Sequence, residues 1–254
     1  MINPRPHILS AALAFAGLSL SAPAGAVAIG QVDDFEDGTT QGWIANLLGM
    51  GVHPAPPANV ASGGPQGADD NYLLITSLGG AGPGSRMTAL NPAGWAGDYT
   101  AAGVRRITLS VNNFGATDLS LRLMFEDALG GPPTNVAFTD SVFAAAGSGW
   151  VDISFDIGLS DLIAGLGTVA DAMSAVTIMR LYHSPAPGFP NPVFPIPAIV
   201  ASLGVDDITA IAEPAALALF GLGLTGLGLT RRRARRCDRR PMPRRPQGRG
   251  PSRR

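Results

Sequence analysis

The sequence predicts an all-β fold, a β-sandwich or jelly roll, between an N-terminal signal helix and a C-terminal single transmembrane helix. Three observations lead to this prediction. Apolar and polar residues alternate along most of residues 31–211, which is the period of two that is typical of strands. Gly- and Pro-rich breaks separate these segments. Charge is also sharply divided, because 12 of the 18 arginines lie in residues 231–254, whereas residues 29–213 carry 18 acids and 5 arginines.

Residues 1–28 are typical of a secretory signal peptide, which the Sec export machinery would read. Arg5 supplies the positive start, residues 8–20 the apolar stretch, and residues 24–26 or 26–28 a small-residue cleavage site. As a helix, the apolar stretch would be about 20 Å long, at about 1.5 Å per residue. The hydrocarbon core of a bilayer is about 30 Å thick. We therefore expect a signal rather than a membrane span.

The body of the chain, residues 29–211, is expected to form nine short strands. The alternation is clearest in residues 106–112, 118–126 and 150–157, each of which would lay one face on a core and show the other to water. Weaker strands are predicted at residues 32–36, 72–77, 87–90, 135–143, 176–182 and 199–210. Only residues 159–173 leave room for a helix.

The sequence of the C-terminal segment predicts a membrane span over residues 215–230, directly after the body. Residues 215–230 contain no charged residue, and Arg231, Arg232 and Arg233 come next. Sixteen residues of helix reach about 24 Å, and flanking arginines can snorkel to make up the difference. Because positive charge stays on the cytoplasmic side, the body would lie on the far side of the membrane. Residues 237–254 are then expected to be a disordered, Arg-rich cytosolic tail.

Residues 213–224 read EPAALALFGLGL and are followed by the arginines. This order resembles the PEP-CTERM sorting signal, also labelled the ice-binding protein C-terminal domain, over residues 212–236. The resemblance implies a sorting motif formed by Glu213, Pro214 and the arginine block, which an exosortase-type membrane protease would cleave. The body would be anchored to the inner membrane from the periplasm and then reach the cell surface or the extracellular matrix. Ala212 stands where the family has proline, so both a cleaved tail and a permanent span stay open.

The two ends of the body also resemble a known fold family. Residues 33–43 read DDFEDGTTQGW and residues 203–210 read LGVDDITA. Both are similar to galactose-binding-like jelly rolls, among them many carbohydrate-binding modules, in which the first and last strands lie near each other. The resemblance implies one structural Ca²⁺, an ion that prefers oxygen ligands. Its ligands would be Asp34, Glu36, Asp206 and Asp207. The alternative is that these acids cap turns and keep the surface soluble.

Aromatic residues are the usual partners of sugars, since a flat ring offers apolar area. Trp95 and Tyr99 lie in a Gly- and Pro-containing loop and are predicted to form the ligand-binding face. Trp43 and Trp150 flank strands and are expected in the core. Phe189 and Phe194, in a Pro-rich loop, are weaker candidates for sugar contact.

Catalysis and nucleic-acid binding find little support in the sequence. The body holds two histidines, His53 and His183, neither at metal-ligand spacing from another. Glu126 and Asp127 are adjacent, so a strand would point them to opposite faces. An acidic body lacks the basic face that nucleic acids require. We therefore expect a non-enzymatic envelope protein that associates with extracellular polysaccharide. The alternatives are a structural matrix protein without a small ligand, a glycan-acting enzyme, and ice binding, for which the expected regular Thr pattern is missing from the sequence.

Overall fold

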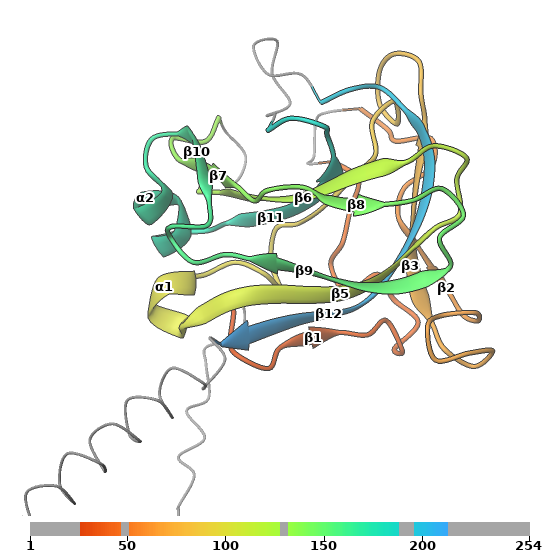
Figure 1. Ribbon diagram of the computed structural model, residues 1–254, viewed down its shortest axis with the longest axis horizontal. Helices are drawn as coiled ribbons and strands as arrows, with labels where there is room; N and C mark the ends of the chain where they lie inside the picture. The colour runs from red at the N-terminus through yellow and green to blue at the C-terminus, as the bar shows by residue number, and fades with distance from the viewer. Residues whose placement is uncertain (1–25, 47–50, 128–131, 188–195, 213–254) are drawn as a thin grey trace, which may run out of the picture. The chain divides into compact units, whose positions relative to one another are not determined.

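A computed structural model describes residues 26–46, 51–127, 132–187 and 196–212, and within them the all-β prediction is confirmed (Figure 1). The described part contains two six-stranded sheets and two short helices. The strands are β1 (Val32–Asp33), β2 (Ala58–Val60), β3 (Tyr72–Leu78), β4 (Thr88–Asn91), β5 (Val104–Asn113), β6 (Leu119–Glu126), β7 (Val136–Phe138), β8 (Val142–Ala144), β9 (Trp150–Asp156), β10 (Ile163–Leu166), β11 (Ile178–His183) and β12 (Val200–Ala212). The helices are α1 (Tyr99–Ala102) and α2 (Val169–Ser174).

The two sheets stack as the layers of a sandwich. Sheet A has the order β2-β3-β12-β5-β9, with β1 paired to β12, and sheet B has the order β10-β7-β6-β11-β4, with β8 paired to β6. In Figure 1, β6, β8 and β11 lie above β5, β9 and β12. Strands β1 and β12 pair antiparallel, with Val32 opposite Thr209. The first and last strands therefore lie side by side, as the resemblance to jelly rolls implied.

One hydrophobic core fills the space between the sheets. Alternate residues of the central strands supply it, so the period of two in the sequence is the period with which side chains face this core. Its largest members from the strands are fully buried, and each such Leu, Val or Ile side chain stabilises the fold by about 1.5–3 kcal/mol. From sheet A they include Leu73, Ile75, Ile107, Val111, Leu203 and Val205, and from sheet B Leu119, Leu121, Leu123, Phe125 and Leu181.

The outer face of sheet B differs from the prediction. Strand β6 was expected to show Arg122 and Glu126 to water, but both are buried. A second apolar cluster of Met124, Val136, Phe138, Tyr182 and Ile196 lies on this face. The charged side chains are satisfied locally, since Arg122 donates hydrogen bonds to the carbonyl oxygens of Ser184, Thr139 and Pro185. Sheet B is thus buried on both faces along β6 and β11.

Strand β12 is bent by a bulge at its middle. Asp206 lies opposite Ser110 and Thr209 opposite Thr108, so β12 has one residue more than β5 between these two pairs. Asp207 takes up the extra residue with a φ of 50°, a left-handed conformation that Asp tolerates better than most residues. The bulge resets the alternation. Val205 and Ile208 both point into the core, and Asp206 and Asp207 are left on the outer side.

Several predicted elements have different bounds. The predicted helix over residues 159–173 is instead strand β10 followed by α2, because Gly165 and Gly167 interrupt the helical stretch. The single strand predicted over residues 135–143 is two strands, β7 and β8. Strand β2 lies between the strands predicted at residues 32–36 and 72–77, where the sequence predicted none. No helix of the described part is long and apolar enough to cross a membrane. The predicted signal segment up to residue 25, Phe189, Phe194, the span over 215–230 and the sorting motif lie outside the described residues.

A buried carboxylate joins the N-terminal segment to the core. The Oδ2 atom of Asp33 accepts hydrogen bonds from the indole Nε1 atoms of Trp43 and Trp95, each at 2.7 Å. Burial raises the pKa of Asp33, whereas the two indole donors lower it and so stabilise the charged form. Both indoles are fully buried, as expected for Trp43.

Removing one of these donors should destabilise the fold. We expect Trp95→Phe to lower the free energy of unfolding by about 1–3 kcal/mol, because the Asp33 carboxylate loses a buried partner. Trp150→Phe is the matched control, since its indole donates to a carbonyl near the surface, and it should change stability by less than about 0.5 kcal/mol. Urea denaturation followed by circular dichroism measures both. Equal stability of Trp95→Phe and wild type would contradict this role of Asp33.

Candidate functional site

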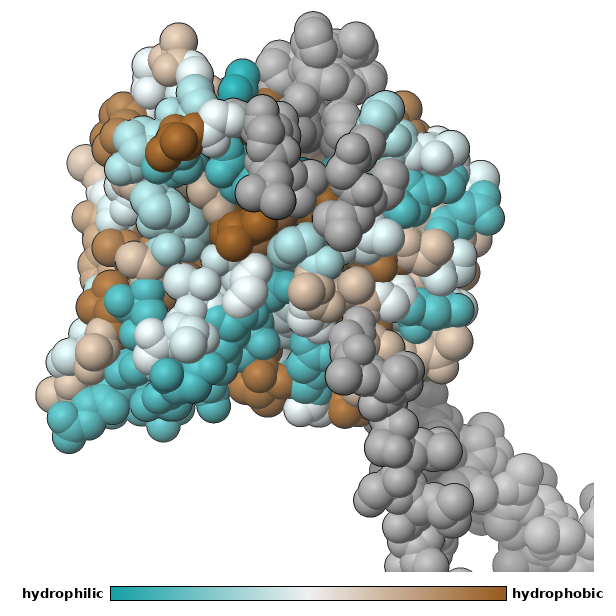
Figure 2. Space-filling view, turned by 180° about the vertical axis from the view of Figure 1, so that it is seen from behind, coloured by the Kyte–Doolittle hydropathy of each residue, from teal (hydrophilic) through white to brown (hydrophobic). Residues whose placement is uncertain are grey.

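The outer face of sheet A is open and polar, unlike that of sheet B. Its middle carries two hollows of about 650 and 610 Å³, which adjoin each other at Val32 and Asp207; together they are called the groove. The first hollow is lined by residues that include Arg106, Thr108, Ser110, Asp152, Ser154, Asp207 and Thr209. The second is lined by residues that include Asp34, Glu36, Gln66, Asp69, Asp70 and Asp207. Figure 2 shows the back of the molecule, where hydrophilic residues form a band along the lower part.

The register of the sheet places these side chains. Asp206, Ser110 and Asp152 lie opposite one another on β12, β5 and β9. The Ser110 hydroxyl donates a hydrogen bond of 2.7 Å to Asp152. At one end of the groove, Arg106 forms an ion pair of 2.6 Å with Asp156. The first hollow therefore follows β5 and β9, with hydroxyl and carboxyl groups along its floor, and the second hollow lies beside it at β1 and the bulge of β12.

An aromatic shelf adjoins the groove one row along the strands. It consists of Tyr72, Phe114 and Trp150, with ring centroids 5.3–6.2 Å apart. Phe114 is 46% exposed, and Tyr72 and Trp150 are half-buried. The indole of Trp150 donates a 2.9 Å hydrogen bond to the carbonyl of Gly63, which fixes the ring. Trp150 lies two residues before Asp152 on β9, so both face the same side of sheet A.

Gly204 makes room for the shelf on the central strand. It lies opposite Asn112, which in turn lies opposite Trp150. A Cβ atom at Gly204 would meet the rings of Phe114 and Trp150 at 2.8 Å each, closer than such atoms approach. The glycine therefore lets the two rings lie directly over β12.

Two acids on the bulge have perturbed pKa values. Burial raises the pKa of Asp206 to about 7; the backbone N–H of Asp207 opposes the shift, and the nearby Asp207, Asp70 and Glu36 add to it. Burial also raises the pKa of Asp207, against a hydrogen bond from Gln66, and Asp70, Asp34 and Asp152 raise it further. Carboxylates of both hollows therefore act on the two acids of the bulge and raise their pKa values.

The predicted ligand face is wrong. Trp95 and Tyr99 are fully buried, because their loop folds into the core instead of standing out from it. The Tyr99 hydroxyl donates to the carbonyl of Trp95, and its ring packs edge-on against Phe125 at 5.1 Å. The expectation that Trp150 belongs to the core is also wrong. Trp150 is in phase with Asp152, Ser154 and Asp156 along β9, a sequence signal that could have placed it on the outer face.

The predicted calcium ligands lie near one another without forming a metal site. Asp34, Glu36 and Asp207 all line the second hollow, and Asp206 adjoins it. Yet in the described ranges no three His, Cys, Asp or Glu side chains are grouped so that they could hold a metal ion. Asp34 instead accepts hydrogen bonds from the backbone of Glu36 and the side chain of Gln41, and Glu36 accepts one from the backbone of Asn71. The oxygen donors suit calcium, but their arrangement does not, so calcium binding stays a prediction.

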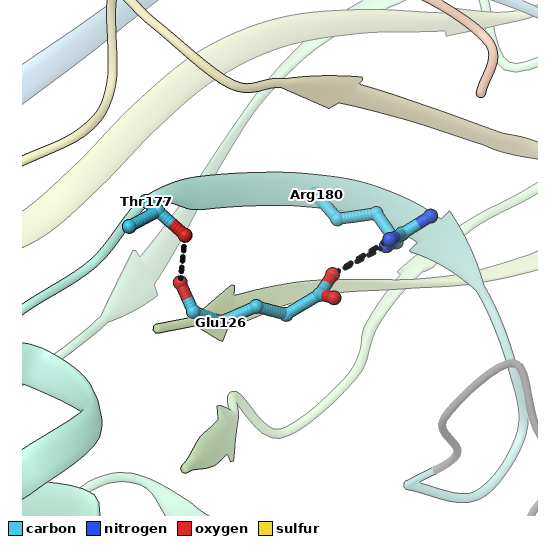
Figure 3. Close-up of polar contacts among 3 residues, drawn as sticks. All are labelled: Glu126, Thr177 and Arg180. Carbon is cyan, nitrogen blue, oxygen red and sulfur yellow. Dashed lines mark hydrogen bonds and ion pairs between the residues drawn. The ribbon is translucent and has the colours of Figure 1, made fainter. Parts of the chain in front are cut away.

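The acids considered for catalysis have structural partners. Glu126 lies on β6 next to Arg180, whose Nη2 and Nε atoms are 2.7 and 2.8 Å from its carboxylate (Figure 3). The Thr177 hydroxyl donates to the backbone carbonyl of Glu126. At Asp127 burial raises the pKa, but hydrogen bonds from Asn135 and Thr134 outweigh it, so the pKa is lowered.

The two histidines of the body are also held by backbone groups. His183 Nδ1 accepts a hydrogen bond from the backbone of Ser120, and His53 Nδ1 accepts one from the backbone of Ala55. Burial lowers the pKa of both imidazoles. Their Nδ1 atoms are thus engaged as acceptors, and neither histidine lines the groove.

Comparison with known proteins supports the fold and leaves the family open. No protein-family model matches the sequence, and no curated protein matches it. Among solved structures, an exo-beta-agarase aligns at a TM-score of 0.50 and 12% identity, over 74% of this chain and 26% of its own, so this chain spans about a quarter of that enzyme. A family 11 carbohydrate-binding module from Clostridium thermocellum aligns at a TM-score of 0.44 and 13% identity, over 73% and 98% of the two chains. A xylan-binding domain from Paenibacillus barcinonensis aligns at 0.40 and 15%, over 74% and 100%. The alignment with the exo-beta-agarase agrees with the two-sheet β-sandwich described above.

The buried acid on the bulge predicts a pH-dependent stability. The pKa of Asp206 is about 7 in the folded protein against an ordinary value of 3.8, so folding takes up a proton between these pH values. The contribution of Asp206 to stability is therefore fully present below about pH 4 and lost as pH rises through 7. Asp206→Asn mimics the protonated form. We expect it to be more stable than wild type by about 2–4 kcal/mol at pH 8, at about 1.4 kcal/mol per pKa unit. The difference should shrink toward zero near pH 4.

Urea denaturation of wild type and Asp206→Asn at pH 4, 6 and 8 tests this sign. Asp156→Asn is a useful control, because Asp156 is an exposed acid whose partner Arg106 is also at the surface. A stability difference for Asp206→Asn that is the same at all three pH values would contradict the raised pKa.

Proposed function

We propose that this chain is an exported, non-catalytic glycan-binding protein of the cell envelope, which associates with extracellular polysaccharide through the outer face of sheet A. The observation that carries the proposal is the aromatic shelf beside the groove. A half-exposed set of rings next to hydroxyl and carboxyl groups offers what a sugar needs, an apolar face and hydrogen-bond partners.

The buried state of the other candidate rings strengthens the choice of this face. Trp43, Trp95 and Tyr99 are fully buried. Trp150 and Phe114 keep ring surface accessible on a sheet that is rigidly paired on both sides of β12. A rigid platform loses little entropy when a sugar chain stacks on it.

Removing the shelf should remove glycan binding. We expect Trp150→Ala and Phe114→Ala each to weaken binding about tenfold, which corresponds to about 1.4 kcal/mol of lost contact. The matched control is Phe143→Ala, because Phe143 is 64% exposed on β8 of the other sheet. Isothermal titration of the full-length chain in detergent with soluble xylan, mixed-linkage β-glucan and agaro-oligosaccharides measures the affinities.

The same experiment separates this proposal from the structural alternative. A matrix protein without a small ligand would bind none of the glycans, and loss of binding in Phe143→Ala equal to that in Trp150→Ala would place the site elsewhere. Hydrolysis of any glycan during the titration, detected as new reducing ends, would support the alternative that the chain is a glycan-acting enzyme.

The location proposed for the protein depends on how its ends are processed. Val27 is 3% exposed, and its backbone N–H donates to the carbonyl of Ala96. Signal cleavage after Ala28 would remove this core contact, so we expect cleavage after Ala26. On the exosortase hypothesis the C-terminus would lie near Glu213, and without processing it would be Arg254.

Mass spectrometry of the protein recovered from cell envelopes and culture medium reads both ends at once. We expect an N-terminus at Val27 and a C-terminus near Glu213 in the surface fraction. A mature N-terminus at Ile29 would contradict the packing argument. An intact C-terminus in every fraction would make the chain a permanent single-span protein.

A further inference from the structure

The groove carries far more negative charge than a neutral sugar requires. Six carboxylates line its two hollows against one guanidinium, that of Arg106, which gives a formal charge of −5 when all are ionised. Arg106 itself is paired with Asp156, which does not line either hollow. The carboxylates of the groove are therefore not neutralised by the described part of the chain.

The charge is spread along the groove and is not concentrated at one point. Asp152 lies in the first hollow, Asp69 and Asp70 lie in the second, and Asp207 belongs to both. Asp206, 1% exposed, stands in the same row as Ser110 and Asp152, and its carboxylate accepts one hydrogen bond among the described residues, from the adjacent backbone of Asp207. The acids that line the two hollows suit positive charges that repeat along a chain.

The aromatic shelf adds a second requirement, which is independent of charge. Phe114 and Trp150 present ring surface beside the groove, and apolar ring faces bind flat, partly apolar groups such as pyranose rings. The occupant must therefore combine sugar rings with cationic groups.

We propose that the groove binds a polysaccharide that carries free amino groups, a polyglucosamine-type chain, through ammonium–carboxylate contacts along the floor and ring stacking on the shelf. This inference rests on the proposed glycan-binding function and names its ligand class. An anionic polysaccharide would be repelled by the carboxylates. An N-acetylated chain would offer them only neutral hydroxyl and amide donors, so their negative charge would stay uncompensated. A basic peptide would satisfy the charge but would not need the shelf.

A pair of probes that differ only in the amine tests the proposal directly. Glucosamine hexamer and N-acetylglucosamine hexamer share one backbone, and at pH 6 the first carries ammonium groups where the second carries neutral amides. With the full-length chain in detergent at low salt, we expect the glucosamine hexamer to bind at least about tenfold tighter, and its affinity to fall as salt is added.

Variants then locate the charge effect. Asp69→Asn with Asp152→Asn removes one exposed carboxylate from each hollow and should weaken binding of the glucosamine hexamer by about five- to tenfold, leaving the N-acetylated hexamer unchanged. Asp140→Asn with Asp161→Asn is the matched control, because it changes the net charge equally at acids that do not line the groove. Trp150→Ala should weaken binding of the glucosamine hexamer too.

The outcomes separate this inference from the function it rests on. Equal affinity for both hexamers, tighter binding of polygalacturonate, or equal losses in the two double variants would overturn the amino-sugar proposal and leave glycan binding intact. An oligolysine of equal charge that binds as tightly as the glucosamine hexamer, with no loss in Trp150→Ala, would overturn it in favour of a basic peptide. Binding of no glycan at all would overturn both.

Discussion

The one-residue bulge in β12 is the constraint on which the site depends. This strand pairs with β3 and β5 along its length and with β1 near its end, so its geometry sets that of sheet A. Without the extra residue, the alternation would turn Asp207 into the core. With it, Val205 and Ile208 stay in the core, Asp207 lines the groove in a left-handed conformation, and Asp206 lies buried beside it. A strained backbone at Asp207 and a buried acid, Asp206, are therefore adjacent in an otherwise regular sandwich.

The two sheets differ in whether their charged side chains have partners within the protein. On sheet B, Glu126 forms an ion pair with Arg180, and Arg122 donates hydrogen bonds to carbonyl oxygens. The charged groups on this face are therefore partnered within the protein. On sheet A, the acids of the groove remain without cations from the described chain. Buried ion pairs stabilise only when both partners are present, whereas unpaired carboxylates lower stability. Binding sites often lower the stability of the fold in this way. The difference between the paired charges of sheet B and the unpaired acids of sheet A therefore supports the outer face of sheet A as the functional face.

Much of the fold could be predicted from the sequence, because burial follows the period of two along β3 and β9. The pairing of the first and last strands followed from the resemblance at the chain ends. The binding face could not be predicted in the same way. Trp95 and Tyr99 have the local setting of an exposed loop, and only long-range contacts, the Asp33 carboxylate and the Phe125 ring, draw them inward. The shelf joins residues from three distant segments, and the only sequence signal of the bulge is the break in alternation between Val205 and Ile208.

Three tryptophans allow the central claim to be tested in one spectrum. The indole N–H groups of Trp43 and Trp95 are buried on Asp33, whereas that of Trp150 lies at the shelf and donates to Gly63. In a ¹⁵N–¹H NMR titration of the full-length chain with glucosamine hexamer, we predict that the Trp150 indole signal shifts with ligand concentration and that the other two stay in place. Shifts confined to Trp43 and Trp95, or no shift in any of the three signals at saturating ligand, would contradict glycan binding on the outer face of sheet A.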